Sequence, residues 1–169
     1  MTNNDILRRL RYTFDFSDKK MIAVFLAAEK IVTRTEISSW LKKEEDPDFA
    51  SFHDIDLATF LNGLINDKRG KKEGEQPKPE KRLSNNLIFK KLKIALNLKS
   101  NDIIEILESA SFVLSEHELS SFFRKPGNSH YRECKDQVLR NFLKGIQLKY
   151  RKDQTPEEVK PSVWDKKPS

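Results

Sequence analysis

The chain has 169 residues, of which 37% are hydrophobic and 34% are charged, and its formal net charge is +6. No apolar run approaches the roughly 20 residues that a membrane-spanning helix needs, and the first five residues have no feature of a secretory signal. The single cysteine, Cys134, excludes an internal disulfide and is typical of a reducing compartment. We therefore expect a cytoplasmic protein without membrane partners.

Residues 4–64 contain four segments in which apolar side chains recur at the three- and four-residue spacing of one helical face. The third segment opens with Thr33 and Glu36, a hydroxyl and a carboxylate spaced as in a helix capping box. Phe49 and Phe52 should pin the connection before the fourth segment to the core. In chain order, the apolar positions are Ile6, Leu7, Leu10 and Phe14; Met21, Ile22, Phe25 and Ala28; Ile37, Trp40 and Leu41; and Leu57, Phe60, Leu61 and Leu64.

The same pattern returns in the second half of the chain. Residues 4–64 align with 86–146 without a gap and share 14 identical residues over 61 positions. Ser115 and Glu118 repeat the capping box. The sequence therefore predicts an all-α fold of two tandem, pseudo-symmetric repeats of about four helices each. A unit of this size has a marginal core, so we expect the repeats to pack through their fourth helices or to be joined by the intervening linker.

Composition places the boundaries between these parts. We expect repeat 1 over residues 1–67, a charged linker with glycine and proline over 68–85, repeat 2 over 86–151 and a flexible tail over 152–169. Trp164 stands alone among the prolines of the tail. It is either a short docking motif or part of an unstructured end.

Six short motifs are distinctive in combination. They are Asn4-Asp5-Ile6-Leu7-Arg8, Trp40-Leu41-Lys42-Lys43-Glu44, Phe60-Leu61-Asn62-Gly63-Leu64-Ile65, Lys68-Arg69-Gly70-Lys71, Lys90-Lys91-Leu92-Lys93-Ile94-Ala95 and Arg132-Glu133-Cys134-Lys135-Asp136-Gln137. With these motifs the chain resembles the YehS-like bacterial family, a domain of unknown function that occurs in two tandem copies. The resemblance covers about residues 3–150 and implies a small, all-helical, cytosolic bacterial protein. It implies no activity and no catalytic residues.

Positive charge is unevenly distributed between the repeats. Residues 4–64 hold 9 Lys and Arg against 11 Asp and Glu, whereas residues 86–146 hold 10 against 7. Basic residues nevertheless recur at matched positions, which suggests two cationic patches that contact phosphates. The alternative is that they lie on solvated helix faces or complement helix C-termini. The candidates are Arg8, Arg9, Arg11, Lys42, Lys43, Arg69, Lys90, Lys91, Lys93, Arg124, Lys125 and Arg151.

The second and third helices of repeat 1 have the order of a helix-turn-helix, with residues 35–43 as its recognition element. However, their turn lacks glycine, and Glu44, Glu45 and Asp46 follow directly. These carboxylates would repel a phosphate backbone, so plain packing of a helix pair is the alternative.

Gly63 and Gly145 lie inside the two fourth helices, where glycine costs about 1 kcal/mol relative to alanine. Their recurrence indicates a close helix–helix approach, which we expect across the interface between the repeats. A ligand pressed against bare backbone is the alternative.

The sequence shows no reaction centre. Cys134 and the three histidines, His53, His117 and His130, form no pair with metal-ligand spacing, and Cys134 aligns with Phe52, which indicates an apolar site. The recurring carboxylates have structural positions: Glu36 and Glu118 complete capping boxes, and Asp54 and Asp136 begin the fourth helices. We expect no catalytic residue, no metal and no cofactor.

These features favour a non-enzymatic binding or adaptor protein that contacts nucleic acid or nucleoprotein through its basic patches. One contiguous face of matched cations would support that function. Scattered cations would favour the alternative, a protein–protein interaction module whose charges only keep it soluble. A small enzyme with an unrecognised site is the third possibility. The sequence does not indicate an oligomeric state.

Overall fold

The computed structural model describes residues 1–151. That part of the chain forms eight α-helices and contains no strand, so the predicted all-α fold of two tandem repeats is confirmed. The predicted tail, 152–169 with Trp164, lies outside the described residues. The helices are α1 (Asn3–Phe14), α2 (Asp18–Ala27), α3 (Arg34–Leu41), α4 (Asp54–Arg69), α5 (Asn85–Ala95), α6 (Ser100–Ser109), α7 (Glu116–Phe122) and α8 (Asp136–Tyr150).

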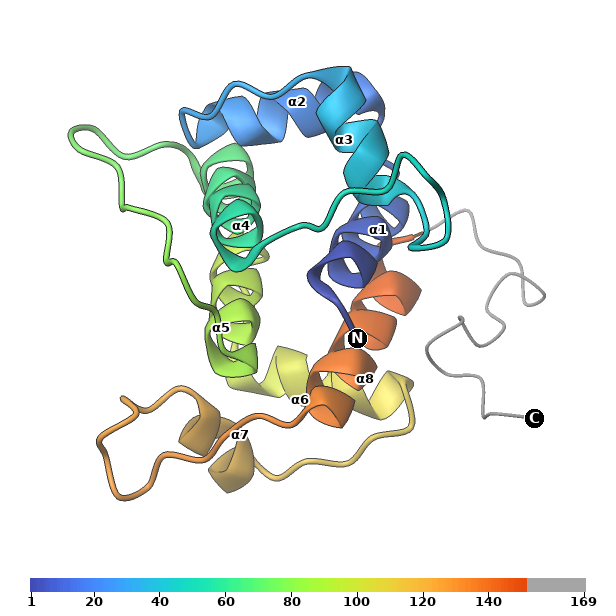
Figure 1. The fold of residues 1–169 in the computed structure, drawn as a ribbon. Coiled ribbons are helices and arrows are strands. Elements are labelled where there is room, and N and C mark those ends of the chain that lie inside the picture. The colour runs from blue at the N-terminus through green and yellow to red at the C-terminus, as the bar shows by residue number, and fades with distance from the viewer. Residues whose placement is uncertain (152–169) are drawn as a thin grey trace.

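Helices α1–α4 form copy 1 and helices α5–α8 form copy 2 (Figure 1). Both predicted capping boxes are present: the backbone N–H of Glu36 donates to Thr33 Oγ1 and that of Glu118 donates to Ser115 Oγ, each over 3.1 Å. Within each copy the second helix packs against the third and the fourth, α2 on α3 and α4, and α6 on α7 and α8. The recurring apolar positions therefore build equivalent cores.

Glycine lets the second and fourth helices of each copy touch closely. A Cβ at Gly63 would lie 2.9 Å from the carbonyl carbon of Val24 in α2, and one at Gly145 would lie 2.9 Å from that of Ile106 in α6. The predicted close approach exists, but the predicted location was wrong: it lies within each copy, not across their interface. The alternative, a ligand pressed against the bare backbone of these glycines, is also wrong, because the backbone of α2 or α6 occupies that place.

A buried asparagine ties the first helix of each copy to the chain around its third helix. Asn4 Nδ2 donates to the carbonyls of Trp40 and Ala50, and its Oδ1 accepts from the N–H of Phe52. Asn86 makes the three equivalent bonds in copy 2, to Phe122, Arg132 and Cys134. Each asparagine thus satisfies three buried backbone groups that would otherwise be costly, and fixes the loop that follows the third helix.

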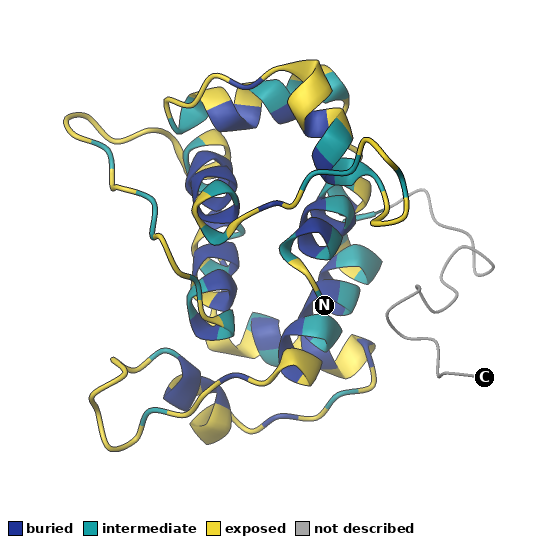
Figure 2. Ribbon diagram, in the orientation of Figure 1, coloured by how far each residue is buried: buried dark blue, intermediate teal, exposed yellow. Residues whose placement is uncertain are grey.

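The two copies pack reciprocally. Across the two copies, α4 packs against α5 and α8 packs against α1, so the fourth helix of each copy contacts the first helix of the other and closes the ring seen in Figure 1. The copies therefore pack through their fourth helices, as predicted, but each fourth helix meets the first helix of the other copy. Since first and fourth helices bury their apolar faces against the other copy as well as their own, the copies share one core (Figure 2).

The linker between the copies returns along α4. Lys91 Nζ of α5 donates to Asn62 Oδ1 of α4 over 2.6 Å and lies 3.0 Å from Glu80 Oε1 of the linker. The backbone N–H of Leu83 donates to Asp54 Oδ2, 2.8 Å away. Most linker residues are exposed, as Figure 2 shows, but these contacts hold its second half against both copies.

Candidate phosphate-binding site

The predicted phosphate-contacting residues do not form one continuous face. Arg9 is 6% exposed and Lys91 is 8% exposed, so these two lie in the interior. Arg69 is exposed at the end of α4. Most of the others gather at two separate pockets, one in each copy, between the first helix and the end of the third helix: Arg8, Arg11 and Arg151 at the copy 1 pocket, and Lys90, Arg124 and Lys125 at the copy 2 pocket.

The copy 1 pocket has a volume of about 380 Å³, but its cations already serve the fold. Arg8 Nη1 donates to the carbonyl of Lys42 over 2.8 Å, and Arg11 Nε donates to the carbonyl of Phe16 over 3.0 Å. Arg151 donates to the carbonyl of Tyr12 over 2.6 Å, with its guanidinium 4.1 Å from the Tyr12 ring centre. These bonds satisfy carbonyls at the ends of helices α1 and α3.

Each of these cations also has a carboxylate partner. The same holds for Lys42, which lies beside the pocket. Paired in this way, the cations present little uncompensated positive charge to an incoming anion. The N···O distances are 2.5 Å for Arg8 and Asp5, 3.0 Å for Arg11 and Asp18, 4.0 Å for Lys42 and Asp46, and 3.5 Å for Arg151 and Asp15.

The Asp5 carboxyl shows how strongly one of these pairs is held. Burial alone would raise its pKa, but the hydrogen bonds from the Thr2 backbone N–H and from Arg8 outweigh burial and hold the pKa below its ordinary value. The carboxylate is thus favoured in its charged form beside Arg8.

The copy 2 pocket has a volume of about 200 Å³ and is lined by three cations and no carboxylate. It matches the copy 1 pocket only in part, because Lys90 and Phe123 are the lining residues equivalent to Arg8 and Leu41. The side chains of Lys90, Arg124 and Lys125 are exposed and form no ion pair or hydrogen bond within residues 1–151. The floor between them is mainly apolar. It consists of Leu87, Phe122, Phe123, Pro126 and Tyr131.

Matched positions show how this difference arises. Every carboxylate that pairs with a cation at the copy 1 pocket has a neutral residue at the equivalent position in copy 2, while the cations Arg8, Arg11 and Lys42 are kept as Lys90, Lys93 and Arg124. Two further acids of copy 1, Glu44 and Glu45, are also lost, to Pro126 and Gly127. The replacements at the pairing positions are Asp5 by Leu87, Asp15 by Asn97, Asp18 by Ser100 and Asp46 by Asn128.

The turn that follows the third helix has the same backbone hydrogen bonds in both copies. In copy 1 the N–H of Asp46 donates to the carbonyl of Lys43, and in copy 2 the N–H of Asn128 donates to that of Lys125. Asp46 Oδ1 and Asn128 Oδ1 each accept from the N–H two residues later, over 2.9 and 2.8 Å. The two copies thus differ in charge on a common turn.

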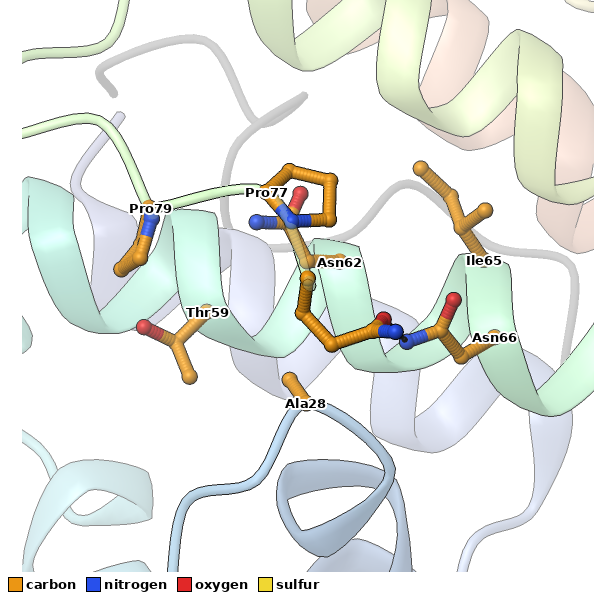
Figure 3. Close-up of a pocket in the computed structure, with 8 residues that line it drawn as sticks. Ala28, Thr59, Asn62, Ile65, Asn66, Pro77 and Pro79 are labelled. Atoms are coloured by element: carbon orange, nitrogen blue, oxygen red, sulfur yellow. Dashed lines mark hydrogen bonds between the residues drawn. The ribbon is translucent and has the colours of Figure 1, made fainter. Parts of the chain in front are cut away.

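A smaller pocket lies between α4 and the linker and has a different character (Figure 3). Its volume is about 60 Å³, and Pro77 and Pro79 of the linker face Thr59, Asn62 and Asn66 of α4 across it. Asn66 Nδ2 donates to the carbonyl of Ala27 and to Gln76 Oε1. Space of this size suits ordered water, and its lining offers no charged group.

The remaining candidates have structural surroundings. Cys134 is 1% exposed and fills the apolar place of Phe52, as predicted. Its burial, with the charge of Asp136, raises the pKa of the thiol to about 12, which makes it a poor nucleophile. The three histidines are exposed, and residues 1–151 contain no group of three His, Cys, Asp or Glu side chains arranged to hold a metal ion.

Sequence reasoning located the cations but missed what distinguishes the two pockets. Phe123 and Tyr131 line the copy 2 pocket, whereas Leu41 and Phe49, which they match in copy 1, were assigned to the core and to a pinned connection. The signal was present: Glu44, Glu45 and Asp46 align with Pro126, Gly127 and Asn128. The three acidic residues were interpreted only for the helix-turn-helix of copy 1, and their absence from copy 2 was not interpreted.

Within residues 1–151 these features define a class of protein: two tandem all-helical copies that share a core, with a cationic pocket in the second copy whose charges are not neutralised by carboxylates. No helix among the described residues is long and apolar enough to span a membrane. The chain belongs to the family described as "Protein of unknown function (DUF1456)", whose model matches residues 3–70 and 85–152.

One relative supports this membership. The chain is 41% identical over 147 residues to the uncharacterized protein YehS of Escherichia coli (strain K12), and the match covers 86% of this chain and 94% of that protein. The resemblance to the YehS-like family is thereby confirmed. No solved structure matches the chain.

Proposed function

We propose that this chain is a non-enzymatic binding protein that contacts the phosphates of a nucleic acid or nucleoprotein through the copy 2 pocket. The observation that carries the proposal is the loss of carboxylates at that pocket. Arg124 and Lys125 have no partner among residues 1–151 and no carboxylate lines the pocket beside them, whereas Lys42 in copy 1 lies near Asp46 and before two glutamates.

Electrostatics explains why the pairing matters. A cation that already has a carboxylate partner gains little from a phosphate, because the new contact competes with the old one. An unpaired cation on an exposed rim gains the full attraction and releases the counterions condensed on the nucleic acid. Copy 2 therefore supports phosphate contact, and the neutralised copy 1 pocket does not.

The number of free cations sets the expected salt dependence. Three phosphate contacts on a single strand give a slope of about −2 in log affinity against log salt, so binding weakens about 20-fold between 50 and 200 mM salt. Arg124→Ala with Lys125→Ala should leave about one contact and a slope near −0.7.

Fluorescence anisotropy with a labelled oligonucleotide tests this expectation directly. Lys42→Ala with Lys43→Ala changes the matched positions of copy 1 and serves as the control, which should bind as the unaltered chain does. A flat salt response of the unaltered chain, or equal losses in both double variants, would contradict the proposal.

A second candidate function, a protein–protein interaction module, rests on a different observation. Ile31 and Val113 occupy matched positions after α2 and α6 and are 82% and 84% exposed. Large apolar side chains so exposed at two equivalent places suit contact with a protein. Ile31→Glu with Val113→Glu should abolish capture of a protein partner from a nuclease-treated lysate, and unchanged capture would exclude this surface.

A further inference from the structure

We infer that the copy 2 pocket takes one nucleotide of a single-stranded nucleic acid, with the base against Phe123 and Tyr131 and the phosphates against Lys90, Arg124 and Lys125. The inference deepens the proposed function and rests on it. It names the form of nucleic acid that the pocket fits.

Aromatic side chains form part of the pocket floor. Phe123 and Tyr131 are each half-buried and line the pocket beside Phe122. Phe123 packs at right angles to Phe89, with 5.3 Å between ring centres and 86° between the planes. Lys93 Nζ lies over the same ring, 5.3 Å from its centre, and leaves the remaining surface of Phe123 to the pocket. An anchored aromatic side chain at an open site provides a surface for a second planar ring.

Positively charged side chains surround that floor. Lys90 reaches the pocket from α5, and Arg124 and Lys125 reach it from the end of α7, so free cations flank the aromatic floor from two elements. A nucleotide unit joins a planar base to a phosphate, which matches this pairing of an aromatic floor and a cationic rim.

The polar groups of the pocket determine how well it can distinguish one base from another. Asn86 also lines the pocket, but its Nδ2 donates to two backbone carbonyls and its Oδ1 accepts from a backbone N–H. The Ser84 hydroxyl accepts from the N–H of Leu87. The pocket thus offers stacking surface and charge but few polar groups to distinguish one base edge from another. We therefore expect weak sequence preference.

The size of the pocket favours a single strand over a duplex. A volume of about 200 Å³ suits one ring system, and a base can enter only when it is not stacked inside a double helix. The main competing occupant, an acidic peptide, would need main-chain partners. The turn around the pocket uses its own groups instead: Asn128 N–H donates to the Lys125 carbonyl, and Arg132 N–H donates to that of Ser121.

The test compares four labelled probes on the full chain: a single-stranded oligonucleotide, an abasic oligomer of the same length, the corresponding duplex and a poly-glutamate peptide that contains phenylalanine. We expect the single strand to bind roughly tenfold more tightly than the abasic oligomer, because stacking of a base on an aromatic side chain raises affinity by about 5-fold to 160-fold. The duplex and the peptide should bind more weakly than the single strand.

Substitutions of the aromatic residues of the pocket floor test whether stacking causes the tighter binding of the single strand. Phe123→Leu introduces the residue that copy 1 carries at this position, Leu41, so it should preserve the fold. It should remove most of the difference between the single strand and the abasic oligomer, as should Tyr131→Ala. Tyr131→Phe keeps the ring and matches Phe49 of copy 1, so it should retain most of the difference that Tyr131→Ala removes. Thermal unfolding of each variant confirms that it is folded.

The outcomes separate the inference from the proposed function. Equal affinity for the single strand and the abasic oligomer, or tighter binding of the duplex, overturns the inference while the phosphate contact stands. Tighter binding of the peptide overturns both and assigns the pocket to an acidic protein segment. No binding of any probe at 50 mM salt likewise overturns both.

Discussion

Paired side chains at the copy 1 pocket stabilise the fold, and Asp5 shows how. Its carboxylate accepts from the backbone N–H of Thr2 over 2.8 Å and from Arg8, which in turn binds the Lys42 carbonyl at the end of α3. One carboxylate thus caps α1 and orients the arginine that closes α3. Leu87 at the matched position of copy 2 can do neither, so there Lys90 is left without this partner.

A pH titration of stability tests the role of Asp5. Because its pKa in the folded state lies below the ordinary 3.8, its contribution is fully present above that value and is lost as pH falls through the lower, folded-state pKa. Asp5→Asn should therefore reduce the free energy of unfolding by about 1 kcal/mol at pH 7, with the gap narrowing below pH 4. Urea unfolding at pH 7 and pH 3 measures it, and a gap of equal size at both values would contradict this role.

Helix packing depends on a single absent side chain in each copy. Helices α2 and α4 approach so closely at Gly63 that even a methyl group would overlap the backbone of Val24, which cannot move away as a side chain can. The same holds for α6 and α8 at Gly145. The cost of glycine inside a helix is therefore offset by the packing that it permits.

Gly63→Ala should consequently destabilise the protein by about 2 kcal/mol, although alanine is the better helix former. Gly127→Ala is the matched control: a Cβ there would meet nothing within 4 Å, and its φ is not in the left-handed region. This second change should be neutral or slightly stabilising. Equal urea midpoints for the two variants would show that close packing is not the reason for Gly63.

For the whole molecule, the internal repeat made most of the architecture predictable, since recurring apolar positions and capping boxes identify helices reliably. The reciprocal packing of first on fourth helices was not predictable, because both helices carry apolar faces that suit either partner. The buried positions of Arg9 and Lys91 were also hidden, since a long basic side chain on an amphipathic helix gives the same sequence signal whether it is exposed or buried.

The candidate site was predictable only in part, for a related reason. Basic residues at matched positions suggested two equivalent patches, yet charge pairing depends on how the fold brings side chains together: Arg11 meets Asp18 across the turn between α1 and α2, and Arg151 meets Asp15 from the end of α8. The matched basic residues therefore suggested two equivalent sites, although carboxylates neutralise only the cations of copy 1. The protein uses one scaffold twice, with one pocket neutralised and the other left cationic.

The central claim is that this missing negative charge makes the copy 2 pocket a binding site. The most direct measurement places the copy 1 acids there, as Pro126→Glu, Gly127→Glu and Asn128→Asp, on a turn whose backbone hydrogen bonds both copies share. Its control changes net charge equally but elsewhere, as Lys72→Ala, Lys78→Ala and Lys81→Ala in the exposed linker. We predict that affinity for a single-stranded oligonucleotide at 50 mM salt falls at least tenfold in the first variant and stays near that of the unaltered chain in the second. Equal affinities for both variants would contradict the account.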